Sequence, residues 1–106
     1  MYLYLKNNKI EIKKAETLVD KIKSFRFKLD EIDYGILLED KKIFNTYFFC
    51  QNIDVIYTDK NNKILKILRN VKSEKILIAP KNASKTFLLK SFITENLDID
   101  DKLKIK

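Results

Sequence analysis

The longest regular pattern of hydrophobic and polar positions lies in the middle of the chain. Aromatic and β-branched side chains dominate residues 44–58, with no glycine or proline among them, which is typical of strands. The polar sequence Asp-Lys-Asn-Asn at 59–62 then supplies turn residues, because asparagine tolerates the left-handed backbone of a tight hairpin. We therefore predict strands at 44–50, 53–58 and 63–69, the last two paired as an antiparallel hairpin.

Shorter apolar segments on both sides of this hairpin predict further strands. Residues 2–5 and 10–12 are separated by two asparagines, which indicates a small hairpin at the edge of a sheet. Brief apolar runs predict additional strands at 36–38, 75–79 and 102–105. These segments indicate a mainly β protein.

One segment near the N-terminus has helical periodicity instead. Thr17 and Asp20 have the spacing of a capping box, and apolar residues follow at i, i+4 and i+7. This pattern predicts a short amphipathic helix over about 17–25.

Residues 84–97 fit two interpretations. Apolar residues four positions apart, starting at Leu89, fit a helix capped by Ser84, and periodicity slightly favours this helix. The apolar run from Thr86 to Leu89 equally fits a strand that leads into a shorter turn.

Length and composition indicate one globular domain over residues 1–106, large enough to form a core without disulfides. The hydrophobic fraction of 45% and the aromatic fraction of 11% exclude a disordered chain. Apolar runs of four residues or fewer predict no membrane span. The N-terminal residues lack the features of a signal peptide, so we expect a cytoplasmic protein.

The residue inventory also excludes several kinds of chemistry. The chain has no histidine, and Cys50 is its single cysteine, which excludes an internal disulfide, the common zinc sites and histidine-based triads. We expect Cys50 to be a small buried hydrophobic residue. The chain is therefore expected to need no cofactor and not to be an enzyme.

The net charge of +7 invites a nucleic-acid interpretation. However, nearly all the positive charge comes from lysines scattered beside acidic residues, whereas phosphate recognition favours the planar fork of arginine. The only arginines are Arg26 and Arg69. This distribution favours a solvated basic surface and keeps nucleic-acid binding as the alternative.

Asp54 interrupts an apolar strand and is the main candidate site residue. A buried carboxylate must be paired, protonated or hydrogen-bonded, because an isolated buried charge is costly. The structural interpretation is that Asp54 forms an ion pair with Arg26 or Arg69, or caps backbone N–H groups. If 58 faces 63 across the hairpin, Arg69 lies diagonal to Asp54 on one face. The functional interpretation makes Asp54, Arg26 and Arg69 ligand-binding residues in a shallow cleft.

Five segments match, in order, the motifs of a family of small bacterial and archaeal proteins: 17–26, 34–38, 43–50, 53–59 and 101–105. Over residues 10–105 the chain resembles the family known as domain of unknown function 192, with Cys50 at its usual methionine. The resemblance implies a compact antiparallel β sandwich or barrel-like domain with one short helix packed on it. It also implies a strand followed by a turn at 84–97. The family implies no particular activity.

These considerations predict a non-catalytic binding or accessory domain that contacts a ligand such as a glycan or a protein near Asp54. The alternative is a basic domain that binds single-stranded nucleic acid through exposed tyrosines, phenylalanines and lysines. The two hypotheses differ in one observable feature, because the alternative requires lysines and aromatic rings on the same face.

Overall fold

The computed structural model describes residues 1–6, 9–14, 34–40, 42–46 and 52–106. The predicted helix at 17–25, Arg26 and Cys50 lie outside the described residues, as does the second half of the predicted strand at 44–50.

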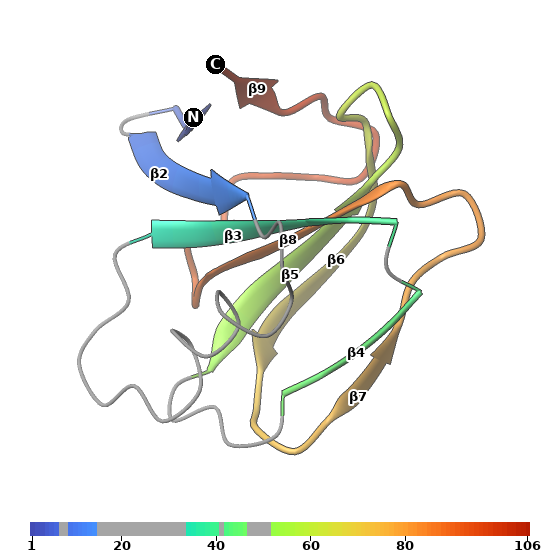
Figure 1. The fold of residues 1–106 in the computed structure, drawn as a ribbon. Helices are drawn as coiled ribbons and strands as arrows, with labels where there is room; N and C mark the ends of the chain where they lie inside the picture. The colour runs from blue at the N-terminus through green and yellow to red at the C-terminus, as the bar shows by residue number, and fades with distance from the viewer. Residues whose placement is uncertain (7–8, 15–33, 41, 47–51) are drawn as a thin grey trace.

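The secondary structure of the described residues consists of β-strands (Figure 1). They are β1 (Tyr2–Tyr4), β2 (Lys9–Lys14), β3 (Tyr34–Glu39), β4 (Ile43–Asn45), β5 (Ile53–Thr58), β6 (Ile64–Val71), β7 (Ile76–Ile78), β8 (Lys85–Lys90) and β9 (Lys104–Ile105). Seven of them form one sheet in the order β6-β5-β8-β3-β2-β1-β9, and β4 pairs with β7 in a separate small sheet. The prediction of a mainly β protein is confirmed.

The strand pairings of the central part are nested. The hairpin of β5 and β6 lies innermost in the sequence, β4 and β7 pair around it, and β3 and β8 pair around both. This nesting is typical of jelly rolls, in which a long hairpin folds over into two facing sheets. In Figure 1 the small β4–β7 sheet lies apart from the large curved sheet, on one side of it.

The large sheet is mixed: the predicted antiparallel arrangement is wrong at one pair and holds at the others. β2 and β3 run parallel, with Ile12 opposite Gly35. Parallel neighbours need a connection of at least a dozen residues, and the residues between β2 and β3 provide that length. The short apolar patterns that predicted these strands carry no information on their relative direction.

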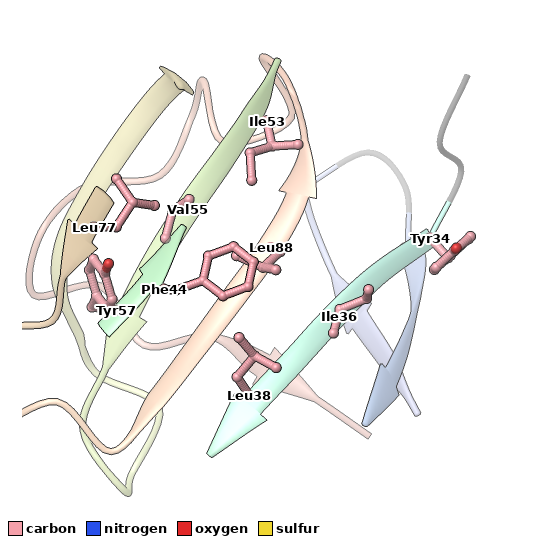
Figure 2. Close-up of a cluster of buried hydrophobic side chains, with 9 residues drawn as sticks. All are labelled: Tyr34, Ile36, Leu38, Phe44, Ile53, Val55, Tyr57, Leu77 and Leu88. Atoms are coloured by element: carbon pink, nitrogen blue, oxygen red, sulfur yellow. The ribbon is translucent and has the colours of Figure 1, made fainter. Parts of the chain in front are cut away.

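The large sheet is buried on both faces around its central strands. Every residue of β5 is buried. One face packs against β4 and β7 through Phe44 and Leu77, and Figure 2 shows this cluster. It includes Tyr57, whose hydroxyl has a raised pKa because burial disfavours the charged form. The other face packs against Leu3 and other residues from both ends of the chain. Strands buried on both faces read as nearly continuous apolar runs, as 53–58 does.

The same double burial decides the two interpretations of residues 84–97. The helix that periodicity favoured is wrong: 85–90 form β8, and turns follow it. β8 lies between β3 and β5 and its Phe87, Leu88 and Leu89 have no exposed surface. A strand buried on both faces needs adjacent apolar residues. Over a short window, such a run contains apolar residues at the spacing of a helix face.

The predicted β5–β6 hairpin is present, but its register differs from the prediction. Thr58 pairs with Ile64, Ile56 with Ile67, and the ladder has irregularities near both ends of β5. Lys63 belongs to the turn, because its N–H and that of Asn61 donate to the Asp59 carboxylate. With Thr58 opposite Ile64 the register moves by one residue, and the two irregularities move it further, so residues 69 and 70 come to lie opposite residue 54.

The Asp59 turn leads to a pH prediction. Hydrogen bonds from the backbone N–H groups, first that of Lys63, lower the pKa of Asp59 from its ordinary 3.8. A lowered folded-state pKa adds stability that is present above pH of about 4 and is lost as the pH falls through the folded pKa. In urea unfolding, Asp59→Asn should therefore be less stable than wild type at neutral pH, and this difference in stability should narrow as the pH falls below about 4. A gap that stays constant over this range would contradict the linkage.

Candidate functional site

Asp54 is fully buried and accepts hydrogen bonds on both carboxylate oxygens. Oδ1 accepts from the backbone N–H of Asn70 at 2.8 Å. Oδ2 accepts from the N–H of Thr94 at 3.2 Å and from its hydroxyl at 2.7 Å. These contacts confirm that the carboxylate is buried and caps backbone N–H groups. Asp54 thereby fixes the segment of residues 91–97, which follows β8.

Arg69 holds the same segment through hydrogen bonds to backbone carbonyl groups. Its Nη2 donates to the carbonyl oxygens of Thr94 and Leu97, at 3.1 and 2.5 Å. Asp54 thus binds donors of the segment, and Arg69 binds acceptors of it. Asp54 and Arg69, the two residues predicted to lie diagonally across the hairpin, both contact Thr94. Neither of the two ion pairs among the described residues joins their side chains directly.

These contacts leave Asp54 in a poor position to meet a ligand. Its side chain has no exposed surface, so a ligand would reach it only after the 91–97 segment moved. Arg69 is exposed, but one of its nitrogens is engaged by two carbonyls. Arg26 lies outside the described residues. The structure therefore does not assemble the three predicted residues into one described cleft.

A different site lies where the two ends of the chain meet. β1 pairs with β9, so Tyr4 lies opposite Lys104, and Figure 1 shows the termini close together. An open cavity of about 600 Å³ lies at this meeting point. We call it the basic groove, and it is lined by Tyr4, Leu5, Lys6, Leu97, Asp101, Lys102, Leu103, Lys104 and Lys106.

The charges of the basic groove are strongly biased. Four lysines and one aspartate line it. The aspartate, Asp101, accepts a hydrogen bond from the N–H of Asp98 at 2.9 Å, which directs one of its oxygens to its own loop. Lysines from both chain ends therefore line a cavity whose one acidic lining residue, among those described, is Asp101.

A second cavity, of about 210 Å³, adjoins the basic groove and shares Leu5, Lys6 and Leu97 with it. Its remaining lining comes from the 91–97 segment, including Phe92. Leu97, at the end of the segment that Asp54 and Arg69 anchor, thus lines both cavities.

Sequence reasoning missed this site, although a signal was present. Residues 102–106 read Lys-Leu-Lys-Ile-Lys, which places lysines at every second position. In an extended segment this alternation puts the lysines on one face. Leu103 and Ile105 accordingly pack with the core cluster. The pairing of this segment with Leu3 and Tyr4 needed the tertiary structure.

The described part of the chain contains neither a metal-binding cluster nor a helix suited to span a membrane. No group of three or more histidine, cysteine, aspartate or glutamate side chains there is arranged to hold a metal ion. No helix there has the length and apolar character that crossing a bilayer requires.

No family model matches the chain, and no curated protein matches it in sequence. The resemblance to the domain of unknown function 192 family therefore stays a prediction. The fold is similar to that of a protein of unknown function from Novosphingobium aromaticivorans DSM 12444, with a TM-score of 0.78 and 14% identity over 98% of this chain and 82% of that one. A proposed transcription regulator from Sinorhizobium meliloti 1021 also has a TM-score of 0.78, with 12% identity over 97% of this chain and 89% of that one. The TM-scores establish a shared fold, and identities this low establish nothing beyond the fold.

Proposed function

We propose that the protein is a non-catalytic binding domain that holds an anionic ligand in the basic groove. The observation that carries this proposal is that Lys6, Lys102, Lys104 and Lys106 all line one open cavity. A cavity lined by one sign of charge concentrates oppositely charged molecules and speeds their association. A binding role also agrees with a sequence that has no histidine for acid–base chemistry.

The lining favours a ligand with an apolar part and several negative charges. Leu5, Leu97 and Leu103 supply apolar surface between the lysines. Lysine is a flexible point charge with three donors, whereas arginine fixes a planar, bidentate geometry. An all-lysine groove therefore suits repeated phosphates at variable positions better than a single carboxylate at a fixed one.

This proposal moves the ligand away from the location expected from the sequence. A glycan or protein contact centred on Asp54 loses support, because that carboxylate is buried and hydrogen-bonded within the protein. Asp54 and Arg69 keep an indirect role, since they hold the 91–97 segment, whose Leu97 lines the basic groove.

Titration with inorganic polyphosphate, followed by two-dimensional ¹H–¹⁵N NMR, tests the proposal. We expect the largest shift changes at Lys6, Lys102, Lys104 and Lys106, and weaker binding as salt screens the charges. Shift changes spread evenly over the surface, or centred on the small β4–β7 sheet, would contradict a binding site in the basic groove.

A matched pair of double variants separates the site from the overall charge. K102Q/K104Q removes two lysines that line the basic groove, and K42Q/K75Q removes two exposed lysines outside it. Both variants lower the net charge equally. Only the first variant is expected to weaken polyphosphate binding strongly. Equal losses of affinity in both variants would show that the binding is non-specific charge attraction.

A further inference from the structure

Two aromatic rings accompany the lysines of the basic groove and its adjoining cavity. Tyr4 lines the basic groove and is 39% exposed, and Phe92 lines the adjoining cavity and is 66% exposed. We infer that the ligand is single-stranded nucleic acid, with bases stacked on these rings and phosphates against the lysines. This inference rests on the proposed function of the same site.

The backbone at Phe92 indicates a role outside the core. Its φ is 69°, in the left-handed region that bulky residues avoid. Such strain persists only where the surroundings enforce it, and it concentrates at functional sites. Here the anchors are the contacts of Asp54 and Arg69 to Thr94, two residues further on. The fold thus holds a strained phenylalanine whose ring is mostly in solvent and adds little to the core.

The arrangement of lysines fits a polymer of phosphates. Lys102 forms a β-bridge with Lys63, Lys104 lies in β9, and Lys106 follows two residues later. Two residues of extended chain span about 7 Å. This spacing is close to that between successive phosphates of an extended single strand, so neighbouring lysines can neutralise neighbouring phosphates.

The exposed rings favour single strands over duplexes. Every base has a flat face that stacks on an aromatic ring, and single-strand binders combine such rings with a basic groove regardless of sequence. In a duplex these base faces are already stacked on each other. Lysines in place of arginines also agree with backbone attraction without base-edge recognition, for which arginine is the usual residue.

Fluorescence anisotropy with three probes tests the inference. The first probe is a labelled oligothymidylate of about 10 nucleotides, within the usual range of single-strand sites. The second is an abasic strand with the same number of phosphates, and the third is unlabelled inorganic polyphosphate as a competitor. We expect the oligothymidylate to bind about a hundredfold more tightly than the abasic strand, because stacking on each of the two rings adds about tenfold in affinity. We expect polyphosphate to displace both strands.

Variants separate stacking from charge. F92G relieves the left-handed strain, so it should keep or raise the Tm while weakening oligothymidylate binding about tenfold and leaving abasic-strand binding unchanged. D40G is the matched control, because exposed Asp40 also has a positive φ of 56° but does not line either cavity. D40G should leave binding unchanged. K102Q/K104Q should reduce the slope of log affinity against log salt by about 0.7 per lysine.

The possible outcomes are distinct. Equal binding of oligothymidylate and abasic strand, or wild-type affinity in F92G, would overturn the inference, while displacement by polyphosphate would still support an anion site. If neither strand nor polyphosphate binds at low salt, both the inference and the proposed function are wrong.

Discussion

Replacing Asp54 with alanine is expected to lower the free energy of unfolding by about 3 kcal/mol. The substitution removes a buried carboxylate and leaves the N–H and hydroxyl of Thr94, and the N–H of Asn70, without their acceptor. Hydrogen bonds to charged groups contribute more than neutral ones, and an unsatisfied buried donor costs its full desolvation. In a domain of this size the Tm should fall by more than about 10 °C, as measured by thermal unfolding.

Two further variants make this result specific. D98A removes an exposed carboxylate near the same segment and should change stability by less than about 0.5 kcal/mol. D54N keeps one acceptor oxygen but brings an amide donor toward Thr94, so it should lie between D54A and wild type. An unchanged Tm in D54A would show that the buried contacts contribute nothing, and the ligand-binding hypothesis for Asp54 would regain support.

Replacing Gly35 with alanine is expected to destabilise the protein by about 1–3 kcal/mol through overpacking. An added Cβ would lie 2.5 Å from Cδ2 of Leu89, 2.7 Å from Cδ1 of Ile12 and 3.2 Å from the carbonyl oxygen of Leu88. The two methyl groups belong to core side chains with 0% and 3% exposure, so they have little space into which to move. The lower chain entropy of alanine in the unfolded state offsets only part of this cost.

A double-mutant cycle tests this cause directly. L89A alone should cost about 2–5 kcal/mol, because it leaves a cavity. In that background the Cβ of G35A enters the vacated space, so the double variant should be more stable than the sum of the single effects predicts, by at least about 1 kcal/mol. Strict additivity would show that the close approach to Leu89 is not what excludes a side chain at position 35.

The two stability predictions also bear on the proposed site. Asp54 and Arg69 together fix the 91–97 segment, and that segment forms part of both cavities. A domain that uses a buried carboxylate and an arginine to shape a surface turn has a pre-organised binding wall. We therefore expect D54A to weaken ligand binding as well as stability, although Asp54 itself touches no ligand.

The sequence alone determined the strands whose patterns are local. The alternation and turn residues of 53–71 predict a hairpin because side-chain direction along a strand and turn propensity depend on near neighbours. The face shared by Ile53, Val55 and Tyr57 was likewise predictable, and these residues lie in one core cluster. The position of Asp54 in an apolar strand predicted that a buried carboxylate would have a partner, because a bare buried charge is costly. The choice between an arginine, backbone N–H groups and a ligand was left open, and the structure shows backbone N–H groups and the Thr94 hydroxyl.

Only the tertiary structure decided the features that depend on contacts between distant residues. The register at Asp54 depended on the Asp59 turn and on the two irregularities in the β5–β6 ladder. The strand conformation of 85–90 depended on a place between β3 and β5. The basic groove depended on the pairing of β1 with β9, which joins residues a hundred positions apart. Lysines scattered along a sequence give no sign of convergence, because their direction in space is set by which strands become neighbours.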